Sequence, residues 1–497
     1  MKIYIDGNIN QYYVQMLCMI FFPGAKFSQN EEEDGENPVL HLTYRGDDEG
    51  AHAYAKIYLG DKSAESERHH AKRDDISADR LKKLAVGDAV ISACGDLLGY
   101  RPSWGMLVGV RPSKVATELL KSGMSKTRVK KQLTSDYFVI PKKAALATEV
   151  AINEDKLIGK PGKKDCSVYI SIPFCPTRCA YCSFVSYTSK RLLDTIPDYL
   201  VQMKRELVAT FDFIKKMGLN LNTVYIGGGT PTTLDEIQLA DLLQTINENI
   251  DVTKLEEYTL ECGRPDTINE EKLRIAKQYG VGRISVNPQI MNDEVLRNVG
   301  RAHDTECFLK AYELARKSGI PIINCDLIAG LPGDKFKTFS DSFDKILALR
   351  PENITVHTFT VKNACDALRH DKNIYSMRGG DVGKSVDYSQ IKAQHEGYIP
   401  YYMYRQKNTV GNFENVGLSL PGCEGLYNIY MMEEVHSIFA VGAGAVSKFV
   451  DYYPADGKER TIERVFNLKY PYEYLAQDRT QEKLDAAEKF YIEHNLI

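Results

Sequence analysis

Between Val168 and Thr360 the sequence alternates short β-like runs with longer segments of helical periodicity. The first run, Val168 to Ile172, alternates apolar and polar residues as a half-buried strand does. The expected strands are Val168–Ile172, Thr223–Gly227, Tyr258–Glu261, Arg283–Val286, Ile322–Ile328 and Asn353–Phe359. The expected helices are Ile196–Met217, Leu234–Ile250, Glu270–Tyr279, Thr305–Ser318 and Lys337–Leu349. This order predicts an α/β fold whose six strand–helix units form a partial (β/α)6 TIM-type barrel, open on one side.

The segments on either side of this region follow other patterns. The first 160 residues predict an N-terminal α/β domain, with strands at Lys2–Ile5, Val39–Tyr44 and Ala53–Leu59 and a helix at Ser77–Val86. His69 and His70, beside Lys72, are expected in an exposed charged turn. Beyond residue 370, an aromatic strand at Tyr398–Arg405 and an amphipathic helix at Gln481–His494 predict a C-terminal α+β domain. We therefore expect domains at 1–160, 161–370 and 371–497.

Composition narrows the class of protein. With 497 residues, 43% of them hydrophobic, the chain can bury more than one core. Its net charge of −4 gives no basic footprint for nucleic acid. The longest apolar stretch, from Val14 to Phe22, is too short and too interrupted to span a bilayer, and nothing at the N-terminus resembles a secretory signal. We expect a cytoplasmic protein with no membrane span and no nucleic-acid partner.

Three of the eleven cysteines lie close together, directly after the first barrel strand. Cys175, Cys179 and Cys182 have the spacing C-x3-C-x2-C, and three thiolates can bind three irons of a [4Fe–4S] cluster, which needs four ligands. The open iron can then coordinate S-adenosylmethionine (SAM), because SAM with an iron–sulfur cluster is an established source of radicals. A zinc site with Cys166 as the fourth ligand is the alternative. The odd, scattered cysteines disfavour a disulfide.

Polar residues and glycines follow the ends of the later barrel strands, where such barrels gather their chemistry. Gly227-Gly-Gly-Thr-Pro231 comes after the second strand, and glycine there lets the backbone approach a ligand closely. Glu261 closes the third strand and Gln289 lies just past the fourth. Asp326 lies in an apolar run, and Arg301 could pair with a carboxylate through two hydrogen bonds. These groups suit the ammonium, carboxylate and ribose of SAM.

Four stretches together resemble a known family. They are Tyr169-Ile-Ser-Ile-Pro-Phe-Cys-Pro-Thr-Arg-Cys-Ala-Tyr-Cys-Ser-Phe184, Gly227-Gly-Gly-Thr-Pro-Thr232, Leu296-Arg-Asn-Val-Gly-Arg-Ala-His303 and Asp326-Leu-Ile-Ala-Gly-Leu-Pro332. They resemble the oxygen-independent coproporphyrinogen III oxidase family of radical SAM enzymes, over about Val168 to Lys448. The long N-terminal extension, and Asn428-Ile-Tyr-Met-Met-Glu-Glu434 leading to Gly442-Ala-Gly-Ala445, are similar to the HemZ branch of that family.

The resemblance implies a role for each matching residue. Cys175, Cys179 and Cys182 would hold the cluster. The residues that match contacts to the cluster-bound SAM are Tyr169, Tyr181 and Glu261. Other residues match a second SAM site of the oxidase, so the protein would bind one SAM molecule or two. They are Gly228, Gly229, Thr230, Gln289, Arg301, Asp326 and Thr360.

The reaction implied by the resemblance is the oxidative decarboxylation of a tetrapyrrole in anaerobic haem biosynthesis. A one-electron donor such as flavodoxin or ferredoxin would reduce the cluster, and SAM would be cleaved to methionine and a 5′-deoxyadenosyl radical. The radical would take a hydrogen atom from a propionate side chain of coproporphyrinogen III. Loss of carbon dioxide and one electron would then leave a vinyl group, as in protoporphyrinogen IX.

Departures from the family pattern leave the substrate open. Phe184 stands where the oxidase carries a cysteine, Ser171 stands where the family commonly has histidine, and the oxidase's tyrosine- and arginine-bearing leader is not recognisable. One alternative is a haem-binding chaperone of the same family, whose relatives carry His-Asn followed closely by Tyr-Trp where this chain has Tyr427-Asn-Ile-Tyr-Met-Met432. Another alternative is a radical SAM enzyme that modifies a tetrapyrrole or opens it in haem degradation.

Overall fold

The computed structural model describes residues 1–27, 37–182, 186–360, 380–406, 409–454 and 460–497. The chain divides into two compact units. The small unit comprises Met1–Ile152, Lys372–Lys384 and Met403–Asn415, and the large unit comprises Asn153–Asp371, Ser385–Tyr402 and Val416–Ile497. The division into three domains that the sequence suggests stays a prediction.

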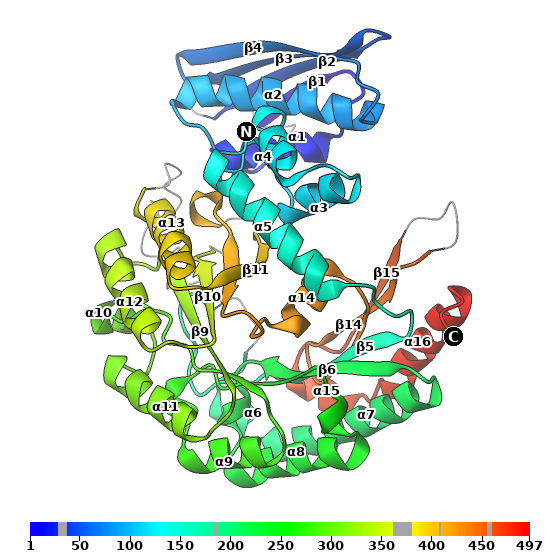
Figure 1. Cartoon of the computed structure of the whole chain (residues 1–497), viewed down its shortest axis with the longest axis vertical. Coiled ribbons are helices and arrows are strands. Elements are labelled where there is room, and N and C mark those ends of the chain that lie inside the picture. Colours follow the sequence, from blue (N-terminus) through cyan, green and yellow to red (C-terminus); the bar gives the residue numbers. More distant parts are fainter. Residues whose placement is uncertain (28–36, 183–185, 361–379, 407–408, 455–459) are drawn as a thin grey trace. The chain divides into compact units, whose positions relative to one another are not determined.

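A four-stranded sheet in the order β1-β2-β3-β4 forms one layer of the small unit. Its strands are β1 (Lys2–Asp6), β2 (Val39–Gly46), β3 (Gly50–Leu59) and β4 (Lys62–Ala71). β1 and β2 run parallel, and the other neighbours are antiparallel. Alternate side chains of β3 are buried, and α2 (Ala78–Leu98) covers one face of the sheet (Figure 1). The expected strands are confirmed, and the expected helix continues past Val86 to Leu98.

The prediction of a charged turn at His69 and His70 was wrong, because both lie in β4. The ring of His69 stacks on that of His52, 4.1 Å away. His70 Nε2 lies 3.0 Å from the carboxylate of Asp88 on α2, and Arg68 Nε donates to the same carboxylate at 2.9 Å. Burial alone would raise the pKa of Asp88, but these two hydrogen bonds hold it below its usual value. These hydrogen bonds therefore connect β4 to α2. β4 is rich in charged residues, so it lacks the alternation of apolar and polar residues by which a strand is predicted from sequence.

Buried charges join distant parts of the small unit's sequence. Its other helices are α1 (Gln11–Phe21), α3 (Ser113–Lys121), α4 (Lys126–Ser135) and, up to Ile152, α5 (Pro141–Ile158). Lys143 on α5 donates to Glu414 Oε1 at 2.5 Å, and Trp104 Nε1 donates to Glu414 Oε2 at 2.8 Å. Each of the three residues is at most 1% exposed. Trp104 is thus buried and makes a polar contact with a residue 310 positions away.

An eleven-stranded sheet forms the core of the large unit, in the order β11-β12-β10-β9-β8-β7-β6-β5-β13-β14-β15. Its central strands, which run parallel, are β5 (Asp165–Ile172), β6 (Asn220–Gly228), β7 (Glu257–Glu261), β8 (Arg283–Ser285), β9 (Ile322–Ala329) and β10 (Asn353–Thr358). The helices on the outside of the curved sheet are α7 (Ile196–Lys216), α8 (Glu236–Asn249), α9 (Glu270–Gln278), α11 (Thr305–Lys317) and α12 (Phe336–Ala348) (Figure 1). This confirms the expected α/β fold with an open parallel sheet.

Strands from the last part of the chain extend both edges of this sheet. At the β10 edge lie β12 (Asn415–Ser419) and β11 (Ile399–Tyr404), and at the β5 edge lie β13 (Ser437–Val441), β14 (Val446–Asp451) and β15 (Thr461–Phe466). β13 runs parallel to β5, whereas β12 is antiparallel to β10. The remaining α-helices are α6 (Lys190–Leu193), α10 (Asp293–Asn298), α13 (Gly380–His395), α14 (Leu426–Glu433), α15 (Pro471–Ala476) and α16 (Thr480–Glu493). The expected aromatic strand and C-terminal helix are therefore confirmed as β11 and α16.

The end of β5 is held by neighbouring elements of the large unit. The Ser171 hydroxyl donates to the carbonyl of Ala443 at 3.0 Å, and the Tyr199 hydroxyl donates to the carbonyl of Ser171 at 2.7 Å. Gly442, with φ of 92°, lies so close that a Cβ there would be 2.6 Å from the Ser171 oxygen. Ser171, which departs from the family pattern, thus fixes the strand from which the cysteine loop emerges.

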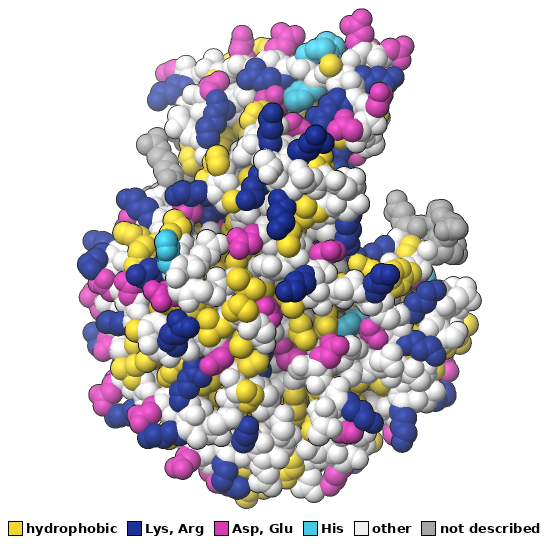
Figure 2. Space-filling view, viewed as in Figure 1, with side chains coloured by type: hydrophobic (Ala, Val, Ile, Leu, Met, Phe, Trp, Pro, Cys, Tyr) yellow, Lys and Arg dark blue, Asp and Glu magenta, His cyan; other side chains and the backbone are white. Residues whose placement is uncertain are grey.

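The surface carries charges of both signs. Figure 2 shows basic and acidic side chains interspersed over the face in view, as the net charge of −4 would suggest. None of the helices that the structure describes is both long and apolar enough to cross a membrane.

Candidate active site

The cysteine loop begins where β5 ends and is fastened at its base. Cys175 N–H donates to the carbonyl of Tyr187 at 3.1 Å, and Tyr187 N–H donates to the carbonyl of Pro173 at 2.9 Å. Cys175, Cys179 and Cys182 are not joined in disulfides, and the first two are 7% exposed. The Cys182 N–H donates to the Cys179 carbonyl at 3.1 Å, which forms a tight turn between these two thiols. Phe184, the other departure in this stretch, lies outside the described residues.

Glycine and threonine after β6 accommodate the loop. Gly229 N–H donates to the carbonyl of Ile172 at 2.8 Å, and Thr230 N–H donates to the carbonyl of Phe174 at 2.8 Å. A Cβ at Gly229 would lie 2.6 Å from the Phe174 oxygen and 3.0 Å from the Cys175 sulfur, so only glycine fits. The Thr230 hydroxyl lies 3.2 Å from the Cys175 sulfur. Burial raises the pKa of the Cys175 thiol, and the Thr230 hydrogen bond opposes that rise.

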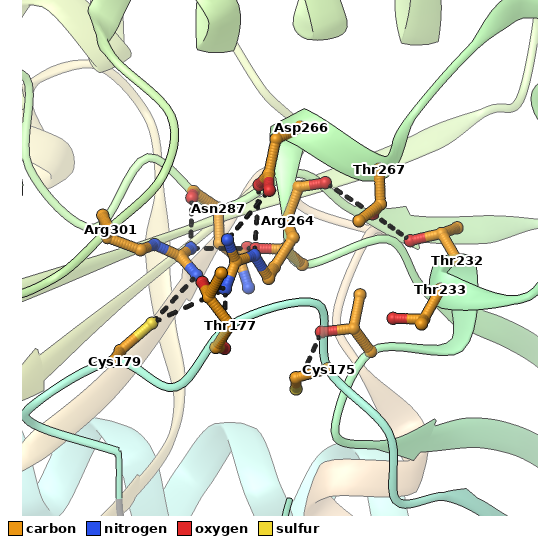
Figure 3. A network of polar contacts seen from close by, with 12 residues as sticks. Cys175, Thr177, Cys179, Thr232, Thr233, Arg264, Asp266, Thr267, Asn287 and Arg301 are labelled. Atoms are coloured by element: carbon orange, nitrogen blue, oxygen red, sulfur yellow. Dashed lines mark hydrogen bonds and ion pairs between the residues drawn. The ribbon is translucent and has the colours of Figure 1, made fainter. Parts of the chain in front are cut away.

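Two buried arginines reach the second cysteine (Figure 3). Arg301 Nη1 lies 3.8 Å and Arg264 Nη1 lies 3.9 Å from the Cys179 sulfur. Arg301 is 8% exposed and Arg264 is 3% exposed. Positive charge beside a sulfur favours the thiolate, which is the form that binds iron. Arg301 Nη2 donates to the carbonyls of Gly263 and Asn287, each at 3.0 Å, and not to a carboxylate as the sequence suggested.

Arg264 is a site residue that the sequence analysis missed. Its Nη1 donates to the carbonyl and hydroxyl of Thr177, at 3.0 and 2.9 Å, and its Nη2 pairs with Asp266 at 2.8 Å. Because Thr177 lies between Cys175 and Cys179, Arg264 joins this part of the cysteine loop to the segment that follows β7. Its position three residues after Glu261, at a strand end, was the available signal.

The zinc alternative does not fit the position of Cys166. This residue lies near the start of β5, whereas the other three cysteines follow the end of that strand. Six residues of strand between Cys166 and Ile172 span about 20 Å. A tetrahedral zinc site needs its ligands about 2.3 Å from one ion, so Cys166 cannot complete it.

Glu261 ends β7 beside the glycines of β6. The Tyr225 hydroxyl donates to its Oε1 at 2.5 Å, and the Gly228 N–H also donates to the carboxylate. A Cβ at Gly227 would lie 3.0 Å from Glu261 Oε2, so glycine makes room for the carboxylate. Burial raises the pKa of Glu261 to about 7, more than the Tyr225 hydrogen bond lowers it, and the charge of Asp326 adds to the rise. A carboxyl in this state can take up a cationic ligand by losing its proton.

Three tyrosine rings stack next to this carboxyl. Tyr169 of β5 lies 6.1 Å from both Tyr225 and Tyr427, and Tyr225 lies 4.5 Å from Tyr427. Burial raises the pKa of each of these phenols, so all stay neutral. The rings therefore form an aromatic cluster with polar ends beside Glu261. The sequence analysis identified Tyr169 and missed the other two, although Tyr225 alternates with apolar residues in β6 as an inward-facing residue would.

Asp326 and Gln289 meet through neighbouring strand ends. Asn287 and Asn324 donate to the Asp326 carboxylate at 2.8 and 2.7 Å, and His357 Nε2 lies 3.7 Å away. Burial would raise the pKa of Asp326, but hydrogen bonds, first that of His357, hold it below its usual value. Gln289 N–H donates to the Asp326 carbonyl at 2.9 Å, and Gln289 takes a φ of 63°, unusual for this residue. Asp326 is thus paired, as expected for a carboxylate among apolar neighbours.

The other predicted residues lie on the same rim or beside it. Burial raises the pKa of the Tyr181 phenol, which interacts with Arg301, Cys179 and Cys182. The Thr360 hydroxyl follows β10 and donates to the Thr358 carbonyl at 3.3 Å. Tyr181 thus lies beside Arg301, Cys179 and Cys182. Gly229 and Thr230 lie beside Cys175, and Gly228 lies beside Glu261. Tyr169 joins them through the tyrosine stack.

Buried polar atoms without partners show that this rim can hold a polar ligand. Among the described residues, Gln289 Oε1, Arg301 Nε, Ser285 Oγ and His303 Nδ1 are buried and have no hydrogen-bond partner. Such atoms are costly unless a ligand or water satisfies them. Together with three cysteines on one loop, none of them in a disulfide, they fit a [4Fe–4S] cluster and a polar cofactor such as SAM.

The fold and this site define a radical SAM protein, and comparisons with known proteins agree. The Radical SAM superfamily model matches residues 169–346. The chain is 41% identical over 360 residues to the oxygen-independent coproporphyrinogen-III oxidase-like protein HemZ of Bacillus subtilis, covering 71% of each chain. The chain therefore belongs to the oxygen-independent coproporphyrinogen III oxidase-like family of radical SAM proteins, which implies a [4Fe–4S] cluster and SAM.

Two further relatives mark the breadth of this similarity. The heme chaperone HemW of Haemophilus influenzae is 33% identical over 335 residues, which cover 66% of this chain and 81% of that protein. The solved structure of coproporphyrinogen III oxidase (HemN) from Escherichia coli aligns with a TM-score of 0.49 and 20% identity, over 67% of this chain and 73% of that one.

Proposed function

We propose that this protein is a radical SAM enzyme that converts propionate side chains of coproporphyrinogen III to vinyl groups. The observation that carries the radical chemistry is the loop of three cysteines outside any disulfide, with Arg264 and Arg301 beside Cys179. The substrate is proposed from the resemblance to the oxidase family, together with the name of the HemZ relative.

In this proposal the cysteine loop holds the cluster and the strand ends hold SAM. Cys175, Cys179 and Cys182 are the iron ligands, and Arg264 and Arg301 stabilise their negative charge. Glu261, once ionised, pairs with the ammonium of SAM. The residues proposed for a second SAM or for the substrate are Gly228, Gly229, Thr230, Gln289, Asp326 and Thr360.

When bound, the reduced cluster and SAM would supply a carbon radical able to take one hydrogen atom from a propionate of the substrate. The propionate would then release carbon dioxide and pass one electron to an acceptor, which leaves a vinyl group. The chain's own part is to fix the reacting atoms and exclude water. Tyr169 and Tyr181, whose phenols burial keeps neutral, would close the site without placing a phenolate charge beside the reacting atoms. A one-electron donor such as flavodoxin or ferredoxin is part of the proposal.

A haem chaperone is the second candidate, favoured by the HemW relative. Against it stands Tyr427, which occupies the stretch where chaperone relatives carry histidine and which is buried in the tyrosine stack. A buried phenol with a raised pKa is a poor axial ligand compared with an imidazole.

The test is an anaerobic turnover assay with reconstituted protein, SAM, dithionite and coproporphyrinogen III. We expect 5′-deoxyadenosine, and protoporphyrinogen IX identified by mass spectrometry after oxidation to the porphyrin. 5′-Deoxyadenosine without a vinyl product would favour another tetrapyrrole reaction. Stoichiometric retention of haem without SAM cleavage would favour the chaperone.

Matched thiol variants separate the site from general damage. Cys182→Ser removes one proposed iron ligand and should abolish both products. Cys307→Ser changes a half-buried free thiol on α11, outside the loop, and should leave both products at wild-type level. Equal activity of the two variants would contradict the proposed cluster site.

A further inference from the structure

A cavity of about 220 Å³ lies within the small unit. Its walls come from α1, from residues 108–110 and from residues 405–406 and 409–412. Apolar side chains dominate the lining, among them Met16, Met19, Ile20, Val108 and Val410. None of the lining residues belongs to the candidate active site.

One buried cation lines this apolar cavity. Arg405 is 3% exposed, and its Nη2 donates to the carbonyls of Leu107 and Gly109. Its Nε and Nη1 are buried and have no hydrogen-bond partner among the residues that the structure describes. The guanidinium carbon lies 5.6 Å from the ring centre of Trp104, which covers one face of the group.

The unsatisfied atoms of the cavity lining are all donors. Besides Arg405 Nε and Nη1, the Nδ2 of Asn412 is buried without a partner in the described part of the chain. No side-chain acceptor of the described lining residues is buried and unsatisfied. A ligand that completes these hydrogen bonds must therefore bring acceptors.

The carboxylate near Arg405 is held by other donors. Glu414 is the nearby carboxylate whose charge acts on Arg405, and it accepts from Lys143 Nζ at 2.5 Å and from Trp104 Nε1 at 2.8 Å. The Nε and Nη1 of Arg405 do not reach an acceptor in the described part of the chain. A planar carboxylate matches the geometry of these two guanidinium donors.

We propose that this cavity is a binding site for an apolar molecule that ends in one carboxylate, with Arg405 and Asn412 holding the carboxylate and α1 covering the apolar part. A water-sized group takes about 30 Å³ of liquid volume. At about 220 Å³ the cavity is on the scale of a short aliphatic acid such as octanoate and is far too small for a whole tetrapyrrole. This site does not depend on the proposed radical reaction.

The test is a titration of the full-length, cluster-loaded protein with octanoate, with octanol as the uncharged control. Trp104 is the only tryptophan of the chain and lies beside Arg405, so its fluorescence reports on this site. We expect saturable binding of octanoate, by fluorescence and by calorimetry, at least tenfold tighter than that of octanol. Equal affinities, or no saturable response, would overturn the proposal.

Three variants identify the groups responsible. Arg405→Met should weaken octanoate binding at least tenfold. Since Arg405→Met also removes buried hydrogen bonds that support the fold, Met16→Glu provides a second test. Met16 is half-buried in the lining, and a glutamate there would offer Arg405 a carboxylate from the protein itself. Met16→Glu should lose octanoate binding, while Met16→Gln, of the same shape, should keep it within about threefold. Equal binding by the Met16→Glu and Met16→Gln variants would contradict the site.

A displacement experiment distinguishes two sources of the carboxylate. If coproporphyrin III displaces octanoate in calorimetry, the natural occupant is a propionate arm of a tetrapyrrole. If it does not, the occupant is a separate small acid. Both results require that octanoate binds through Arg405 and therefore support the site.

Discussion

At the scale of single residues, the closest steric constraint in the site is at Gly229. A Cβ there would lie 2.6 Å from the Phe174 oxygen and 3.0 Å from the Cys175 sulfur, so Gly229→Ala must push the cysteine loop aside. We expect the variant to lose about 1–3 kcal/mol of stability and most of its capacity to bind the cluster. Iron and sulfide quantification after reconstitution measures this. Gly282→Ala is the control, because the nearest atom to a Cβ there is 4.0 Å away.

Glu261 predicts a pH dependence of SAM binding. Its pKa of about 7 means that the carboxyl is mostly protonated at pH 6 and mostly ionised at pH 7.5. If the carboxylate pairs with the SAM ammonium, affinity rises about five- to tenfold over this range. Calorimetry in buffers of different ionisation enthalpy should also detect proton release on binding. SAM affinity that is flat from pH 6 to 7.5 would exclude this role.

The same carboxyl affects the stability of the protein without ligands. Its pKa is raised in the folded state above the unfolded value of about 4.3, so the folded state holds the extra proton and stability falls as the pH rises from about 4.5 to 7. Glu261→Gln should remove this part of the fall, and should raise the melting temperature more at pH 8 than at pH 5. It should also weaken SAM binding and abolish its pH dependence.

Residue identities in the site were only partly predictable. The cysteines, Glu261 and Arg301 carry local signals, namely spacing or position at a strand end. Arg264 reaches Cys179 only because β7 and the cysteine loop are adjacent in the fold. Tyr427 joins Tyr225 across 202 positions of sequence, a contact that no local pattern specifies.

At the scale of elements, a buried charge network joins the C-terminal helices to α7. Glu206 is 2% exposed and accepts hydrogen bonds from Lys483 of α16, Tyr474 at 2.5 Å, Asn467 at 2.8 Å and the Gly442 N–H at 2.8 Å. Lys483→Met leaves the carboxylate without its cation, and should cost about 3–5 kcal/mol in urea unfolding. The double variant Lys483→Met, Glu206→Gln should recover much of this loss; no recovery would mean that packing, not charge, accounts for it.

The periodicity of apolar residues along the sequence predicted most helices and strands. It failed for β4, whose charged residues are explained only by the elements that pack against them. The six parallel strands were found because both faces are buried and read as apolar runs. β4 was missed because it is mostly charged, and its pairing depends on Asp88 of α2 and on the antiparallel register with β3.

At the scale of the whole molecule, the division into units could not be read from sequence order. The stretch Met403–Asn415 belongs to the small unit, although β11 and β12 on either side of it extend the large sheet. Its contacts are with Trp104, Leu107 and Lys143, which are hundreds of positions earlier. These contacts are made by single buried side chains, so no change of composition marks the ends of the stretch in the sequence.

This interleaving predicts the result of removing the N-terminal part. A chain that begins at Asn153 leaves Glu414 without Lys143 and Trp104, and Arg405 without the carbonyls of Leu107 and Gly109. Uncompensated charges and donors then favour exposure of residues 403–415 to water. We expect limited proteolysis, followed by mass spectrometry, to cut within this stretch at least tenfold faster than in the full chain. The double variant Arg405→Gln, Glu414→Gln in the shortened chain should slow the cleavage, because uncharged side chains cost less to bury without partners. Equal resistance of the shortened and full chains to the protease would contradict this prediction.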